Sequence, residues 1–192
     1  MRNIIISTIV LLLVLTGCSG RQEQFRIGVS QCLDDAWRQK MNEEMELELL
    51  LHPEITLTKR VAFGNNELQC AQIDSFIAEH VDLLIVSPNE AEAVKPAVSR
   101  AYHAGIPVIV ADRRVSGNEW TAFIGGDNYR VGLLMANWIL SIQATQTTPL
   151  HVLEVAGLPG STPATLRHAG MADKLSESEG VQPHVASVMG AW

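Results

Sequence analysis

The sequence predicts an α/β fold, with a mostly parallel sheet covered by helices on both faces, and three observations support it. The segments VDLLIV at 81–86 and IPVIVA at 106–111 are almost entirely apolar, as strands buried on both faces of a parallel sheet are. Stretches with apolar residues at helical spacing separate the strand-like stretches along the chain. Polar loops follow the strands, and open α/β sheets bind ligands where their strands end.

Composition limits the size and the partners of this fold. The chain has 192 residues, 47% of them hydrophobic, which suffices for one large domain or one and a half small ones. The formal net charge is −7, and the Lys and Arg residues are scattered rather than gathered in one patch. The electrostatic footprint of a nucleic-acid-binding protein is missing, so we expect no nucleic-acid partner.

Residues 1–18 have the features of a targeting segment. Arg2 gives a positive start, and the apolar run 4–15 is short beside the roughly 20 residues of a membrane span. The ending Leu15-Thr16-Gly17-Cys18 resembles a bacterial lipobox. This resemblance implies cleavage before Cys18 and a lipid anchor on its thiol, with residues 19–24 as a polar tether. The alternative is an ordinary signal peptide or signal-anchor with an incidental Cys.

A first lobe is expected over residues 25–145, with strands and helices in regular alternation. Its predicted elements are a strand at 25–30, a helix at about 35–51, a strand at 55–63, a helix after the turn at 64–66, the strand at 81–86, a helix closed by Gly105, the strand at 106–111, a strand at 121–124 and a helix after Asn128. Asp34 could cap the first helix, since an Asp oxygen accepts free backbone N–H groups there.

Two of these helices have faces that we expect to be buried. One carries a narrow stripe of small residues that would let it lie close to the sheet: Ala93, Val94, Ala97, Val98 and Ala101. The helix after Asn128 carries larger residues at helical spacing: Val131, Leu134, Met135, Trp138, Ile139 and Ile142. Trp120 and Trp138 are interpreted as packing residues.

A partial second lobe is expected over residues 149–192, after the polar linker ATQTTP at 144–149. Its predicted elements are a strand at 150–156, a Gly/Pro/Ser/Thr loop at 157–163, a helix at about 164–177 and a strand at 181–188. Two strands and one helix are too few to cover both faces of a sheet. The second lobe is therefore expected to be incomplete and the chain truncated.

The stretch FRIGVSQCLDDAW at 25–37 is the strongest candidate for a ligand-binding segment. It reads as the first strand, a polar turn and the start of the first helix. The turn contains no Gly, but it contains two carboxylates and an amide and is followed by Trp37. That chemistry suits a polyhydroxylated neutral ligand better than a phosphate.

Three loops at predicted strand ends match one family pattern: Ser30 to Trp37, Asp112-Arg113, and Gly157 to Gly170. Together they resemble the type I periplasmic sugar-binding proteins, the ribose-binding-like group. The phrases GVSQCLDDAWRQKM, VDLLIVSPNEA and AFIGGDNYRVG most resemble the periplasmic sensor domains of hybrid two-component histidine kinases in Bacteroidetes-type bacteria. The resemblance covers residues 25–192 and implies two Rossmann-like lobes that close on one sugar.

The resemblance also implies which residues bind the sugar. They are Asp34, Trp37, Asp112, Arg113, Arg167 and Trp192. The two Trp residues correspond to aromatics that pack on the sugar ring, and the others to groups that bind its hydroxyls and oxygens. A carboxylate accepts bonds from paired hydroxyls, and an Arg fork donates to oxygens. The sequence departs from the family where Ala36 replaces a second aromatic and Asp34 replaces a common Asn.

These residues also have structural interpretations. Asp34 or Asp35 could only cap a helix, and Trp37 could belong to a core with Met41 and Met45. Asp112 could pair with Arg113 or Arg114 as a plain ion pair. Arg167, on a helix of mixed polarity, would by default be solvated.

Other function classes lack their sequence features. A nucleotide-dependent enzyme of Rossmann type needs G-x-G-x-x-G after the first strand, where this chain has Ser30-Gln31-Cys32-Leu33-Asp34. There is no G-x-S-x-G nucleophile motif, and a LacI-type repressor would begin with a helix-turn-helix rather than a signal. The six His residues have no metal-ligand spacing. No enzyme activity, metal or cofactor is expected, while a disulfide between Cys32 and Cys70 stays open.

The expected function is therefore capture of a pentose or hexose in the periplasm by a membrane-anchored lipoprotein of the cell envelope. The resemblance favours sensor input for a two-component system, with kinase modules downstream. The alternative is a free-standing binding lipoprotein that delivers sugar to an ABC permease. A Rossmann-type enzyme is the remote alternative.

Overall fold

The computed structural model describes residues 24–180 and 182–190 and contains a five-stranded parallel sheet. Its strands are β1 (Phe25–Gln31), β2 (Ile55–Val61), β3 (Leu83–Ser87), β4 (Val108–Ala111) and β5 (Ala122–Ile124). The order is β2-β1-β3-β4-β5, with every neighbouring pair parallel. The expected doubly wound parallel sheet is thereby confirmed. Its strand order reverses at β1 and β3, which is where such sheets bind ligands.

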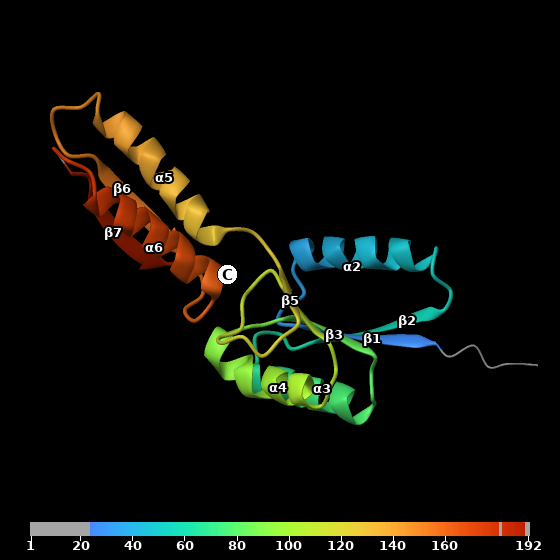
Figure 1. Ribbon diagram of the computed structural model, residues 1–192. Helices are drawn as coiled ribbons and strands as arrows, with labels where there is room; N and C mark the ends of the chain where they lie inside the picture. Colours follow the sequence, from blue (N-terminus) through green and yellow to red (C-terminus); the bar gives the residue numbers. More distant parts are fainter. Residues whose placement is uncertain (1–23, 181, 191–192) are drawn as a thin grey trace, which may run out of the picture.

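Helices cover both faces of this sheet (Figure 1). Helix α2 (Ala36–Leu49) lies on one face, while α3 (Asn66–Ala78) and α4 (Ala91–His103) lie on the other. The core lies between the sheet and α3 and α4, and its fully buried residues include Phe76, Leu84, Val86 and Val110. The small-residue stripe of α4 is largely buried, as expected: Val94, Ala97, Val98 and Ala101. Trp120 packs against the same core, also as expected.

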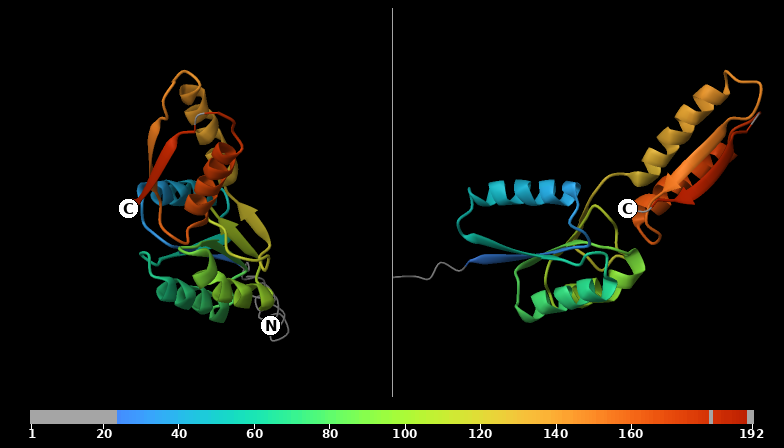
Figure 2. Two further views of the ribbon diagram at one scale, coloured as in Figure 1. Left: turned by 90° about the vertical axis from the view of Figure 1, so that its left-hand side faces the viewer. Right: turned by 180° about the vertical axis from the view of Figure 1, so that it is seen from behind.

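The rest of the chain forms a smaller unit with two strands and two helices. Strands β6 (His151–Ala156) and β7 (His184–Met189) pair in parallel, and α5 (Asn128–Gln143) and α6 (Thr162–Ser176) lie on one side of them (Figure 2). The buried hydrophobic cluster of this unit contains Ala136, Ile139, Met171 and Leu175. On the other side of the sheet, Leu153 and Val155 are 63% and 55% exposed.

Helix α5 packs on α6 and not on the five-stranded sheet. The two helices cross at Gly132 and Gly170, where an added Cβ would lie 2.2 Å from the Arg167 carbonyl oxygen and 2.2 Å from the Tyr129 carbonyl oxygen, respectively. The expected division after residue 145 placed α5 in the first lobe, so the structure differs from that expectation. Helical spacing shows which residues share a face, but it does not show which partner covers that face.

The apolar face expected on α5 is only partly right, for the same reason: Ile139 is buried, but Leu134 and Trp138 are not. Trp138 is 68% exposed and Leu134 59% exposed. The face of α5 that is buried consists mostly of small and polar residues, together with one Ile: Asn128, Gly132, Ala136, Ile139 and Gln143. The segment expected as a linker, 144–149, closes back on this helix. Gln143 donates from Nε2 to the Thr148 carbonyl oxygen at 3.1 Å and accepts from the Leu150 backbone N–H at 2.8 Å.

Two further properties concern the described residues as a whole. Cys32 is buried and Cys70 half-buried, and both are free thiols. Across 24–180 and 182–190, no helix combines the length and apolarity that a membrane crossing requires.

Candidate functional site

The site is built from loops that follow three neighbouring strands. Strand β1 leads into Cys32 to Asp35, β3 leads into Pro88 and Asn89, and β4 leads into Asp112 and Arg113. Because the strands are parallel and adjacent, Gln31 stands beside Ser87 in register and the three loops meet at one edge of the sheet. The loops expected to bind ligand in the first lobe therefore lie together.

Arg38 lies at the centre of this edge with only 4% of its area exposed. Its Nη2 donates to Asp112 Oδ2 at 2.9 Å and to Ser87 Oγ at 3.3 Å. Its Nη1 forms an ion pair with Asp35. The Arg38 Nε is buried without a hydrogen-bond partner among the described residues. The guanidinium therefore joins the ends of β1, β3 and β4 while its Nε–H stays without a partner.

Arg38 was not among the residues expected to bind ligand. The usable signal was its spacing: it follows Asp35 by three positions in the first helical turn, where the two side chains share a face. A buried Arg is costly unless it is paired, and the pairing partner Asp112 lies 74 residues away in sequence. Local patterns therefore could not show that Arg38 is buried.

Asp112 takes an uncommon backbone conformation. Its φ is +64°, in the left-handed region that few residues other than Gly adopt, and its N–H donates to the Ile124 carbonyl oxygen at 2.8 Å. Its carboxylate pairs with Arg38 at 2.9 Å, while the Arg113 Nε lies 4.0 Å away. The plain Asp112–Arg113 ion pair is thus not the principal contact, and the side chain keeps 28% exposure.

Arg113 reaches toward the neighbouring loop. Its Nη1 donates to the Asn89 carbonyl oxygen at 3.0 Å, and its side chain is 12% exposed. Arg114 instead stacks on Phe123, with its Cζ 3.8 Å from the ring centroid. Of the two consecutive Arg residues, only Arg113 therefore has its guanidinium at the edge where Asp112 lies.

Asn89 is a second polar residue at this edge that was not among the expected ligand residues. It is 2% exposed, and its Nδ2 donates to the Gly64 carbonyl oxygen at 3.0 Å and to Asn66 Oδ1 at 2.9 Å. The Asn89 backbone N–H donates to Gln69 Oε1 at 2.9 Å. Its own Oδ1 is buried without a hydrogen-bond partner among the described residues.

The edge therefore has one unused buried donor, on Arg38, and one unused buried acceptor, on Asn89. Each unsatisfied buried polar group costs about 1–3 kcal/mol. A hydroxyl group both donates and accepts, so it is the type of group that could satisfy both kinds of atom.

Asp34 and Trp37 both lie in or beside the first loop. Asp34 is exposed, and the N-cap of α2 is Asp35, whose Oδ1 accepts from the Arg38 backbone N–H at 2.9 Å. Of the two carboxylates interpreted as possible caps, Asp35 is confirmed as the cap, and the expectation for Asp34 is wrong. Trp37 is 55% exposed, so the interpretation of it as a core residue is also wrong. Its ring centroid is 5.6 Å from the Arg38 Cζ.

Opposing effects act on the pKa of Asp35. Partial burial works to raise that pKa, but the backbone N–H and the guanidinium of Arg38 outweigh burial and hold it below its ordinary value of 3.8. Asp35 is therefore a carboxylate at neutral pH. Its negative charge and that of Asp112 both face the Arg38 guanidinium.

Arg167 belongs to α6 in the smaller unit. It is exposed, and its Nε donates to Asn128 Oδ1 at 2.8 Å. Two hydrogen bonds join the units near the start of α6. The Ala91 N–H donates to the Gly160 carbonyl oxygen at 3.2 Å, and the Arg114 N–H donates to Thr162 Oγ1 at 2.7 Å.

Of the six expected ligand residues, the structure places four at the sheet edge, namely Asp34, Trp37, Asp112 and Arg113, and one, Arg167, in the smaller unit. The sixth, Trp192, lies outside the described residues, as does Cys18. The roles of all six stay predictions.

Residues 29–189 match a family model described as a periplasmic binding protein domain. The chain belongs to this family. The expected family is thereby confirmed, and the matched range includes both the five-stranded sheet and the smaller unit.

Curated periplasmic binding proteins are similar to this chain at low identity. The galactofuranose-binding protein YtfQ of Escherichia coli strain K12 is 26% identical over 131 residues, which are 66% of this chain and 41% of YtfQ. The ribose import binding protein RbsB of Bacillus subtilis strain 168 is 25% identical over 153 residues, which are 79% of this chain and 49% of RbsB. The chain thus spans less than half the length of both relatives.

Solved structures of the family are also similar. The fructose binding periplasmic domain of hybrid two component system BT1754 is 40% identical with a TM-score of 0.77, over 86% of this chain and 53% of that one. A Mycobacterium smegmatis protein in complex with β-D-fucofuranose is 27% identical with a TM-score of 0.75, over 86% and 55%. Both similarities agree with the fold expected from the sequence. The first also agrees with the expected resemblance to sensor domains.

Proposed function

We propose that this chain supplies the first-lobe side and part of the second-lobe side of a sugar-binding crevice in a periplasmic protein, and that it acts by binding without catalysis. The ligand class is a neutral monosaccharide, a pentose or hexose. Asp112, Arg113 and Arg38 would bind its hydroxyls, and Trp37 would pack on its ring. Arg167 and Trp192 would contribute from the second lobe.

The ion pair between buried Arg38 and partly exposed Asp112 is the observation that carries this proposal. It fixes a carboxylate and a guanidinium at the switch point of the sheet, beside an exposed aromatic ring and two unused buried polar atoms. A sugar offers hydroxyls for the polar groups and an apolar C–H face for the ring. Phosphate ligands are disfavoured because Asp34 and Asp35 bring negative charge to the same loop.

The similar proteins support the same ligand class. The similar proteins are named for binding fructose, galactofuranose or ribose, or were solved in complex with β-D-fucofuranose. We infer a role as sensor input for a two-component system, because the 40% identical neighbour is a domain of such a system. The second candidate is an ABC transporter component, which the similarity to a ribose import binding protein favours.

Calorimetry with a panel of pentoses and hexoses, including fructose, ribose, xylose and arabinose, tests the proposal. The panel is titrated into this chain and into the longest product of its reading frame. At least one sugar should bind the longer product, and the Asp112→Ala variant should bind it more weakly. If no sugar in the panel binds either product, the proposal is wrong. Reading the gene beyond the codon for Trp192 distinguishes the two roles. Kinase modules encoded downstream would indicate a sensor. A stop codon after one more lobe would indicate a free-standing binding protein.

A further inference from the structure

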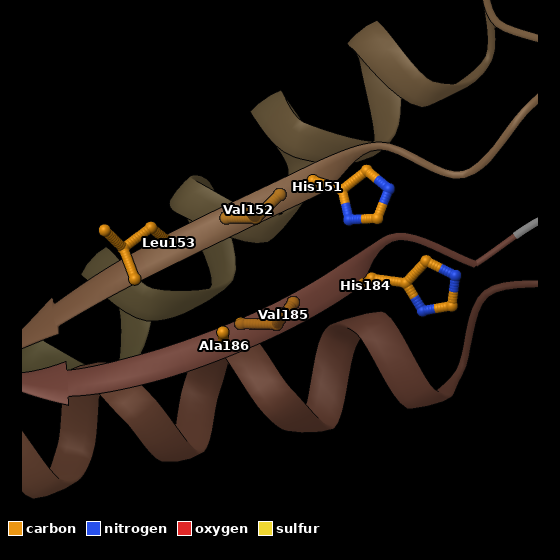
Figure 3. Close-up of a pocket in the computed structure, with 6 residues that line it drawn as sticks. All are labelled: His151, Val152, Leu153, His184, Val185 and Ala186. Carbon is orange, nitrogen blue, oxygen red and sulfur yellow. The ribbon is translucent and has the colours of Figure 1, made fainter.

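Strands β6 and β7 each begin with a histidine, and the two are direct partners in register. His151 stands opposite His184, and the His184 N–H donates to the Leu150 carbonyl oxygen at 2.7 Å, which holds that register. The ring centroids are 5.3 Å apart with 29° between the ring planes. Figure 3 shows both rings side by side at the same end of the two strands.

The surroundings of the two rings leave their nitrogens available. Both residues are exposed, and they line an open cavity of about 270 Å³ whose other walls are apolar: Val152, Leu153, Val185 and Ala186. The segments 147–153 and 180–187 contain no Asp, Glu, Lys or Arg. The rings therefore supply the polar side-chain groups of this cavity.

Three other histidines of the chain have ring nitrogens that contact carboxylates. His52 contacts Glu54, His103 contacts Glu119, and His168 contacts Glu154 through ring nitrogens at 2.8 to 3.3 Å. A ring nitrogen bonded to a carboxylate carries a proton. His151 and His184 stack on one another instead, and an imidazole offers a metal ion one nitrogen lone pair.

We propose that His151 and His184 together bind one divalent transition-metal ion, with Cu²⁺ held most tightly. Neighbouring strands lie about 4.8 Å apart, and the exposed rings can turn about χ1 and χ2 so that one nitrogen of each reaches an ion at roughly 2.0–2.1 Å. In the described part of the chain, no group of three or more His, Cys, Asp or Glu is placed to hold a metal. The site therefore supplies two protein ligands, and water completes the coordination shell.

The donor set determines which ions this site accepts. Imidazole nitrogen suits Cu²⁺, Ni²⁺ and Zn²⁺, and affinity in such sites rises along the first-row series to a maximum at Cu²⁺. Mg²⁺ and Ca²⁺ require oxygen ligands, and neither imidazole ring offers one. A bound ion would also clamp β6 to β7 and stabilise the smaller unit, because the pair forms only when the two strands are aligned.

The test is a Cu²⁺ titration of the tag-free 192-residue chain at pH 7.5, followed by calorimetry and electron paramagnetic resonance. One Cu²⁺ should bind per chain, with hyperfine splitting from two equivalent imidazole nitrogens. Since each ring supplies half of the chelate, His151→Gln and His184→Gln should each weaken binding by roughly tenfold or more. His52→Gln is the matched control and should bind as the parent does, while Mg²⁺ should give no signal.

Three results would overturn the proposal. They are unchanged affinity in the His151→Gln, His184→Gln double variant, loss of the ion in His52→Gln, and a spectrum of the parent with fewer than two nitrogens. The spectrum of the parent decides the matter even if a variant fails to fold.

Discussion

The Arg38 guanidinium donates to the Asp112 carboxylate at 2.9 Å and so joins the first turn of α2 to the loop after β4. The pair lies at the carboxyl edge of the five-stranded sheet, where Ser87 also contacts Arg38. Arg38 is buried, whereas part of the Asp112 side chain is exposed to solvent. The pair therefore combines a structural bond with a carboxylate that a ligand can reach.

Removing the Arg38 side chain should destabilise the protein. Arg38→Met leaves Asp35 and Asp112 facing one another without their shared cation, and we expect the free energy of unfolding to fall by about 1–3 kcal/mol. Urea denaturation followed by circular dichroism measures the change. Arg100→Met is the matched control, since the exposed Arg100–Asp74 pair should contribute less than about 1 kcal/mol. Equal effects of the two substitutions would contradict the central role of Arg38.

Replacing Asp112 tests the ligand site itself. Asp112→Ala removes an acceptor for sugar hydroxyls, and we expect binding to weaken by roughly 2–5 kcal/mol because the remaining charged groups lose their partner. Calorimetry with the sugar that binds the parent measures the loss. Asp74→Ala, on the exposed face of α3, should bind as the parent does. An Asp112→Ala variant with parental affinity would show that Asp112 lies outside the site.

The ionisation of Glu154 should make the smaller unit sensitive to acid. Burial works to raise the pKa of Glu154, but hydrogen bonds from Ser187 and His168 outweigh it and keep this pKa below its ordinary value of 4.5. A lowered pKa stabilises the folded state above about pH 4.5, and the contribution is lost as pH falls through the folded pKa. Amide exchange in β6 and β7 should therefore become faster relative to β3 below that pH. Glu154→Gln should flatten this pH dependence, and an unchanged profile in that variant would refute the assignment.

The close crossing of α5 and α6 should depend on Gly132. An Ala there would place its Cβ 2.2 Å from the Arg167 carbonyl oxygen, so the helices must move apart, and such overpacking costs about 1–3 kcal/mol. Gly126→Ala is the control, because nothing lies within 4 Å of its Cβ position. Thermal unfolding compares the two variants, and equal melting temperatures would show that the crossing adapts without cost.

Lipidation of Cys18 is a prediction from sequence that lies outside the described residues. It rests on Leu15-Thr16-Gly17-Cys18 after a short apolar run. Mass spectrometry of protein expressed in a bacterial envelope should find diacylglycerol on Cys18 as the first residue of the mature chain, and Cys18→Ser should leave the precursor uncleaved. Cleavage at another position, or an unmodified Cys18, would rule out the anchor.

The sequence by itself determined the fold class and the location of the candidate edge. Continuous apolar segments such as VDLLIV at 81–86 predict strands buried on both faces, and they became β3 and β4. The stripe from Val94 to Ala101 predicted the buried face of α4. These features can be predicted from short segments, because the hydrophobic periodicity of a segment shows which of its faces is buried.

Only the tertiary structure decided which side chains meet. Arg38 and Asp112 are 74 residues apart, and they are partners because the strand order β2-β1-β3-β4-β5 places the ends of β1, β3 and β4 side by side. The packing of α5 on α6, at Gly132 and Gly170, likewise depends on contacts between separate elements. Periodicity contains no information on strand order or helix partners. These follow from burying apolar surface over the whole chain at once, which no single segment encodes.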